Sequence, residues 1–303
     1  MIGFVFSGQG AQFAGMGKDL AEADPAVMAL YDRANEVLGF DLKGVCFDGP
    51  AEALTKSDIC QPAIFTTSMA CLVAFEKAHP QVAAGCFAGL SLGEWTALCA
   101  ADALIFEDTL KILQARGRFM QEACDANPGG MLSVMSATEE QIKALCDAAG
   151  ITIANINSPV QVVLSGAKEG IEKAKALCAE QKIKAIPLQV AGAFHSPLMK
   201  PARDKLAAFF AETKFTAPAT PVFANVTGKP HEPCGYVVRD TMLLQVTNTV
   251  RWADCVQGMI AGGVDSFIEF GPGKVVSGLI SRINKDVKVQ NVQDAATLAA
   301  LQL

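Results

Sequence analysis

The chain has 303 residues, of which 51% are hydrophobic and 18% charged, with a formal net charge of −6. This composition excludes a disordered chain, and the acidic balance argues against a general nucleic-acid-binding protein. Met1 leads directly into the first apolar strand without a basic segment, and no apolar run reaches the length of a membrane span, so neither a signal peptide nor a membrane anchor is expected.

The N-terminal part of the chain predicts alternating strands and helices. A strand at 2–6 leads into the loop Gly8-Gln9-Gly10, and a second strand lies at 84–88. Helical spacing of apolar residues predicts helices at 17–38, 51–54, 61–79, 91–100 and 106–123. The loop lacks the third glycine of a dinucleotide-binding fingerprint, because position 13 is Phe13. Its glycines would instead let a backbone N–H approach a reacting carbonyl.

The most informative motif follows the second strand. Gly89, Ser91 and Gly93 form a G-x-S-x-G pattern between an apolar strand and a helix. A nucleophile elbow requires this order, since the glycines permit a tight turn that exposes the serine at a helix start. The motif alone is common, so an ordinary serine in a glycine-flanked turn was the alternative. The N–H of Leu92, directly after the serine, would supply one oxyanion-hole donor.

One charge on the next predicted helix faces inward. At 100° per residue Arg116 lies within the apolar face of this helix, whereas Arg118 points nearly opposite. A buried guanidinium is costly unless it is paired. The sequence leaves open a structural salt bridge or a clamp for a substrate carboxylate.

The middle of the chain predicts a separate small unit. Strands at 131–136, 151–156, 160–164 and 183–190 alternate with helices at 138–149 and 167–181 in the order βαββαβ, which is ferredoxin-like. We therefore predict an α/β fold with a subdomain, 126–192, inserted into a large domain of residues 1–125 and 193–303. The large domain resumes with a helix at 197–211, strands at 222–226 and 266–270, a helix at 274–283, a strand at 287–292 and a helix at 295–301.

A serine nucleophile needs a base, and the chain has three histidines. His79 precedes a proline at a helix end, and His231 lies in a polar loop where we expect it to be solvated. His195 lies in a loop of small residues where the inserted unit returns to the large domain. A cleft between domains is a usual place for an active site, so His195 is the best candidate for the base. No acidic third member stands out.

Six stretches, in order from residue 6 to 274, together resemble the malonyl-CoA:acyl carrier protein transacylases. They are Phe6-Ser-Gly-Gln-Gly-Ala-Gln12, Gly89-Leu-Ser-Leu-Gly-Glu94, Arg116-Gly-Arg-Phe-Met-Gln121, Asn157-Ser-Pro159, Gly192-Ala-Phe-His-Ser196 and Glu269-Phe-Gly-Pro-Gly-Lys274. The resemblance implies an α/β-hydrolase-like domain with a ferredoxin-like insertion, as the element order also predicts.

The resemblance also implies roles for individual residues. Ser91 would be the nucleophile, His195 the base and Arg116 the clamp for the malonyl carboxylate. Gln9 and Leu92 would donate the oxyanion-hole N–H groups. In this family a main-chain carbonyl orients the histidine, often that of a glutamine before a tryptophan; Arg251 precedes Trp252 here, which assigns the carbonyl to Arg251.

Two local features bear on this resemblance. The residue before the nucleophile is commonly histidine in the family but is Leu90 in this chain, which removes a possible polar contact. The tripeptide Ala193-Phe194-His195 resembles the malonyl-selecting form of related polyketide acyltransferases.

The implied activity is transfer of a malonyl group from malonyl-CoA to acyl carrier protein through a malonyl-serine intermediate. It needs no cofactor and no metal, and the ten cysteines, no two closer than 11 residues, show no zinc-type spacing. We expect a cytoplasmic monomer with free thiols, without nucleic-acid or membrane partners. The alternatives are a polyketide-pathway acyltransferase, a serine esterase, and a non-catalytic carrier-protein-binding subunit.

Overall fold

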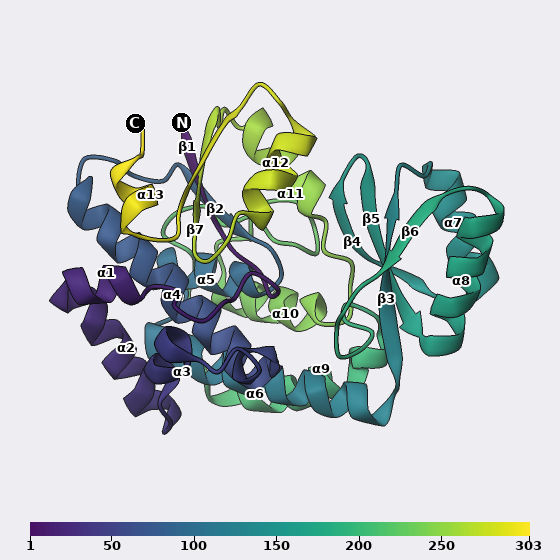
Figure 1. Ribbon diagram of the computed structural model, residues 1–303, viewed down its shortest axis with the longest axis horizontal. Helices are drawn as coiled ribbons and strands as arrows, with labels where there is room; N and C mark the ends of the chain where they lie inside the picture. The colour runs from purple at the N-terminus through teal and green to yellow at the C-terminus, as the bar shows by residue number, and fades with distance from the viewer.

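The computed structural model describes residues 1–303 and contains two separate β-sheets (Figure 1). The larger part is built on a parallel sheet with the strand order β2-β1-β7-β8. Its strands are β1 (Ile2–Phe6), β2 (Cys86–Gly89), β7 (Ser266–Phe270) and β8 (Lys288–Val292). Because β1 and β2 are parallel neighbours, the loops that follow them start at the same edge of the sheet. One loop carries Gln9 and the other Ser91.

The smaller part is an antiparallel sheet with the order β4-β5-β3-β6. Its strands are β3 (Gly129–Met135), β4 (Thr152–Ser158), β5 (Gln161–Ala167) and β6 (Lys184–Pro187). Helices α7 (Glu139–Ala149) and α8 (Lys168–Glu180) pack together beside this sheet, on the right in Figure 1. Thr138 and Gln141 form a capping box that starts α7. The predicted α/β fold with an inserted βαββαβ unit is confirmed.

The parallel sheet is covered on both faces, as parallel sheets usually are. Phe4 and Phe6 of β1 join the largest apolar core, which includes Phe75, whereas Val5 between them joins a second core with Trp252. The covering and flanking helices are α1 (Lys18–Ala23), α2 (Pro25–Leu38), α3 (Leu42–Asp48), α4 (Ser57–Ala78), α5 (Leu92–Ala100), α6 (Phe106–Ala126), α9 (Lys200–Phe209), α10 (Gly235–Gln245), α11 (Trp252–Ala261), α12 (Val275–Ile283) and α13 (Ala295–Ala299). Short 3₁₀ turns occupy Ala53–Thr55, Pro197–Met199 and Phe210–Glu212.

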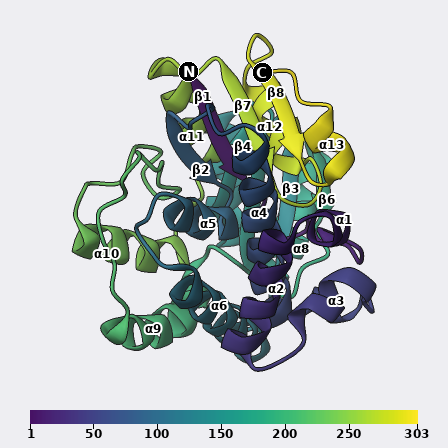
Figure 2. The same ribbon diagram turned by 90° about the vertical axis from the view of Figure 1, so that its left-hand side faces the viewer.

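Helix α4 lies at the centre of the larger part and packs against α6, which in turn packs against α9 (Figure 2). It is the one helix long and apolar enough to cross a membrane, a property the sequence analysis did not find. However, 78% of its most apolar window is buried inside the protein. The chain termini lie at the same end of the molecule in both views.

Several predicted elements differ from the structure. The helix expected at 17–38 is two helices, because Asp24 has extended backbone angles and caps a new helix that starts at Pro25. Helices α3, α10 and α11 were not predicted. The strand expected at 222–226 is wrong: Val222 and Phe223 form only isolated bridges, and the chain turns away at Gly228, whose φ is +67°.

Candidate active site

Ser91 lies on a sharp turn between β2 and α5. Its φ of 52° and ψ of −95° are unusual for a residue with a side chain, which is the strain expected of a nucleophile elbow. No side chain fits at either flanking glycine, since a Cβ on Gly89 would clash with the backbone of Gly93, and a Cβ on Gly93 with the backbone of Phe6. The Asn225 side chain braces the turn, accepting from the Ser91 N–H at 2.7 Å and donating to the Gly89 carbonyl at 2.9 Å. The predicted strand–turn–helix context is confirmed.

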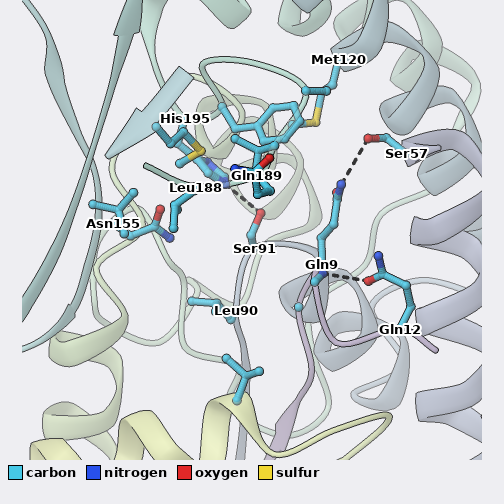
Figure 3. Close-up of a pocket in the computed structure, with 18 of the residues that line it drawn as sticks. Gln9, Gln12, Ser57, Leu90, Ser91, Met120, Asn155, Leu188, Gln189 and His195 are labelled. Atoms are coloured by element: carbon cyan, nitrogen blue, oxygen red, sulfur yellow. Dashed lines mark hydrogen bonds between the residues drawn. The ribbon is translucent and has the colours of Figure 1, made fainter. Parts of the chain in front are cut away.

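His195 approaches Ser91 from the loop that leaves the small sheet (Figure 3). Its Nε2 lies 2.8 Å from Ser91 Oγ, and its Nδ1 lies 2.8 Å from the main-chain oxygen of Gln245. A carbonyl can only accept, so Nδ1 carries the hydrogen and Nε2 is free to accept the serine proton. The imidazole is therefore held in the tautomer that a general base requires.

The carbonyl that orients His195 is not that of Arg251, and this part of the prediction is wrong. The Arg251 oxygen accepts the Cys255 N–H at 3.0 Å, the first intrahelical hydrogen bond of α11. Gln245 instead ends α10, where the last carbonyls have no intrahelical partner and are available to other donors.

Burial and the nearby positive charge of Arg116 lower the pKa of His195 from 6.5 to about 4. Protonation would place a second cation beside the buried guanidinium of Arg116. His195 is consequently neutral at physiological pH, as a base must be.

This shift predicts an unusual pH profile. Because the base must be unprotonated, we expect kcat/KM for acylation of Ser91 to be flat down to about pH 5 and to fall tenfold per unit below about pH 4. Initial rates measured at short times would establish the profile, with activity on return to neutral pH as the control for acid denaturation. An acid limb centred near 6.5, the value of an ordinary histidine, would contradict the expectation.

Arg116 is buried and directed at the same serine, so the predicted inward orientation is confirmed. Its Nη1 donates to Gln61 Oε1 at 2.8 Å, and its Nη2 to Ser91 Oγ at 3.0 Å and Gln245 Oε1 at 3.2 Å. All three acceptors are neutral, and Nε has no partner. Burial lowers the Arg116 pKa to about 10, which leaves it charged at neutral pH. The structural salt bridge that the sequence left open is not formed.

The backbone N–H groups of Gln9 and Leu92 have no acceptor within the protein; Leu92 directly follows Ser91, and Gln9 lines the same cavity as Ser91. Leu92 begins α5, where the first N–H groups have no intrahelical partner. The Gln9 side chain anchors its loop: it donates to Ser57 Oγ at 3.2 Å (Figure 3). It also accepts from Gln61 Nε2 at 3.3 Å. Two unpaired donors near a serine are what an oxyanion hole needs.

Ser91, His195 and Arg116 line a cavity of about 390 Å³ between the two sheets. The larger part contributes Gln9, Leu90, Ser91 and Arg116, and the small sheet contributes Asn155 and Asn157 from β4. Leu90, which replaces a common histidine, gives the wall beside Ser91 an apolar side chain (Figure 3). The structure forms no cluster of metal-ligating side chains.

Sequence reasoning missed a polar layer behind the serine. His231 was expected to be solvated, but its side chain is fully buried, and its Nε2 lies 2.8 Å from Glu94 Oε1. The backbone N–H of His231 donates to the Val222 carbonyl, and this hydrogen bond holds the His231 loop against the segment at residue 222. The one sign of this polar layer in the sequence is Glu94, a charged residue inside an apolar run, three residues after Ser91.

The chain is similar to known proteins along almost its whole length. Residues 3–302 match the acyl transferase domain family. The chain is 40% identical to the malonyl CoA-acyl carrier protein transacylase of Bacillus subtilis, over 98% of this chain and 95% of that protein.

Two solved structures extend this similarity to the whole fold. An acyl carrier protein S-malonyltransferase from Vibrio cholerae superposes with a TM-score of 0.95 at 38% identity, covering 99% of both chains. A malonyl-transacylase solved in complex with its type II PKS acyl-carrier protein superposes with a TM-score of 0.94 at 36% identity, covering 99% of this chain and 98% of that one.

Proposed function

The chain belongs to the acyl transferase domain family and, within it, to the malonyl CoA-acyl carrier protein transacylases, and we propose how its residues carry out the transfer. The protein transfers a malonyl group from malonyl-CoA to the phosphopantetheine thiol of acyl carrier protein in fatty-acid synthesis. The observation that supports the assignment of residues is that two groups meet at one serine oxygen. Ser91 Oγ lies within 3.0 Å of both a neutral histidine and a guanidinium without a carboxylate partner.

In the first half-reaction, Ser91 Oγ attacks the thioester carbonyl while His195 Nε2 takes the serine proton. The N–H groups of Gln9 and Leu92 stabilise the negative oxygen of the tetrahedral intermediate, and one such donor is typically worth about 2.7–4 kcal/mol. The intermediate collapses, the C–S bond breaks, and coenzyme A leaves as a thiol after taking the proton from His195. Malonate remains esterified to Ser91.

In the second half-reaction, the carrier-protein thiol gives its proton to His195 and attacks the ester. The Ser91 oxygen leaves and is reprotonated by His195, which completes a ping-pong cycle. Arg116 holds the malonyl carboxylate in both halves through its fork of donors. One thioester is exchanged for another, so the transfer requires no cofactor.

The location of Arg116 argues against the alternative functions. A serine esterase would share Ser91 and His195 but would have no use for a buried cation without a carboxylate partner. A non-catalytic binding subunit would need neither the histidine tautomer nor the strained serine. An acyltransferase of a polyketide pathway has the same chemistry and differs in its carrier protein, the kind of partner bound by the 36% identical malonyl-transacylase.

We further propose that residues 126–192 form an inserted subdomain within a domain of residues 1–125 and 193–303, with the cavity between them. All ten cysteines are free thiols, which supports a cytoplasmic location. Every proposed catalytic group comes from one chain, which supports action as a monomer.

The intact mass of the protein after brief exposure to malonyl-CoA tests the proposal. We expect a single malonyl adduct that acyl carrier protein removes, and little adduct with acetyl-CoA, which would leave Arg116 without a partner. An adduct that decays into water at the same rate with or without carrier protein would indicate a hydrolase. The absence of any adduct would contradict the covalent mechanism.

A further inference from the structure

Two ionisable side chains that have no part in the mechanism above lie buried directly behind the nucleophile. Glu94 is in the first turn of α5, and His231 reaches it from the loop below the sheet edge. Both side chains are completely inaccessible to solvent, and Glu94 Oε1 lies 2.8 Å from His231 Nε2. Neither touches the cavity that holds Ser91.

The other oxygen of Glu94 accepts two hydrogen bonds that lead to the catalytic groups. Gln245 Nε2 donates to Glu94 Oε2 at 2.6 Å, and the Asn225 N–H donates to it at 3.2 Å. Both partners also contact the turn that carries Ser91. The Asn225 side chain hydrogen-bonds to the backbone of Gly89 and Ser91, and Gln245 Nε2 donates to the Ser91 carbonyl at 2.9 Å.

Gln245 connects this carboxylate to the remaining two groups. Its main-chain oxygen accepts from His195 Nδ1 at 2.8 Å, and its side-chain oxygen accepts from Arg116 at 3.2 Å. Because Gln245 Nε2 is held by Glu94, the side-chain oxygen is directed at the guanidinium. Through Gln245 alone, the carboxylate of Glu94 is therefore connected by hydrogen bonds to the nucleophile, to the base and to the residue that binds the malonyl carboxylate.

Stability alone does not account for such an arrangement. Replacing both partners of a buried hydrogen bond by apolar side chains of the same shape can be nearly neutral for stability, or even stabilising. The two hydrogen bonds that Glu94 Oε2 accepts, however, come from Asn225 and Gln245, which both contact the catalytic groups. We propose that the Glu94–His231 pair is a positioning device, in which Glu94 fixes Gln245 and Asn225, and through them His195 and the elbow, while His231 fixes Glu94. The role in malonyl transfer rests on the function proposed above.

Substitutions at Glu94 separate this role from a simple contribution to stability. In Glu94→Ala, the Asn225 N–H loses its acceptor and Gln245 Nε2 keeps only the Ser91 carbonyl. The end of α10 can then shift, and the main-chain oxygen of Gln245, which accepts from His195, shifts with it. A displacement of about 1 Å at a reacting group can cost about 100-fold in rate. In Glu94→Gln, the amide oxygen still accepts from both donors, and the amide NH₂ can donate to His231 once its hydrogen moves to Nδ1. This variant should retain most of the reactivity.

The experiment measures the reactivity of Ser91 with a fluorophosphonate probe, which needs the activated serine but no malonyl group, carrier protein or Arg116 partner. The same variants are then assayed for malonyl loading from malonyl-CoA. Tyr31→Phe is the matched control, because Tyr31 donates a fully buried hydrogen bond to Thr67 at 3.0 Å and neither residue lines the cavity that holds Ser91. Melting temperatures are recorded for every variant.

We expect Glu94→Ala to lower both the labelling rate and malonyl loading about 100-fold, Glu94→Gln to restore both to within about tenfold of wild type, and Tyr31→Phe to lower only the melting temperature. A folded Glu94→Ala that labels at the wild-type rate would overturn the proposal. If Glu94→Ala does not fold, His231→Ala carries the test, since wild-type labelling by that variant would equally overturn it. Failure of wild type to load malonate while it labels normally would refute the proposed function and leave the positioning role supported.

Discussion

Replacing Ser91 with alanine should abolish malonyl transfer, lowering kcat/KM about 10⁶-fold, the loss typical when the nucleophile of a covalent mechanism is removed. No other nucleophile is placed to substitute for it, because His195 Nε2 and the Arg116 fork both converge on Ser91 Oγ. The buried thiols are also unreactive: burial raises the pKa of Cys46 and Cys60 to about 12. The measurements are intact mass after exposure to malonyl-CoA and the steady-state transfer rate.

The control for this substitution is Ser68→Ala in the buried helix α4. Ser68 is fully buried, and its hydroxyl has no hydrogen-bond partner, so its removal should leave the transfer rate unchanged. A malonyl adduct on Ser91→Ala would show that another side chain carries the intermediate. Retention of more than about 1% of the wild-type rate, far above the residual expected for such a variant, would lead to the same conclusion.

The parts of the site that could be predicted from sequence are those set by local pattern. The glycines around Ser91 and the strand before it define the elbow within a few residues, and the helical period alone places Arg116 on the buried face. His195 could be identified as the base by elimination among three histidines and by its position where the inserted unit returns to the large domain. Each of these inferences needed only neighbouring residues or a regular period.

The parts that could not be predicted depend on contacts between distant segments. Any residue can supply a main-chain carbonyl, so residue type gave no indication that the oxygen beside His195 belongs to Gln245 rather than Arg251. The burial of His231 depends on a backbone bond to Val222, in a segment expected to be a strand but joined to the sheet only by isolated bridges. The role of Glu94 requires both of these tertiary contacts, which is why a carboxylate near the serine went unnoticed.

Replacing Arg116 with alanine should remove the preference for malonyl-CoA over acetyl-CoA. Truncating one partner of a buried, hydrogen-bonded ion pair costs 2–5 kcal/mol, so we expect kcat/KM for malonyl-CoA to fall about 10³-fold, or about 4 kcal/mol. The rate with acetyl-CoA, which has no carboxylate to bind, should change far less. Rates of Ser91 acylation by each thioester, measured separately, give the ratio directly.

Arg118→Ala is the matched control, because Arg118 lies two residues away on the same helix, with its side chain exposed and its guanidinium over the Phe119 ring. It should leave both rates unchanged. Equal losses with the two thioesters in Arg116→Ala would mean that the guanidinium mainly organises Ser91, to which it donates at 3.0 Å, rather than selecting the substrate. In the free protein the guanidinium has only neutral acceptors, and the malonyl carboxylate supplies the opposite charge that it lacks. We therefore expect the loss of acylation rate to be confined to malonyl-CoA.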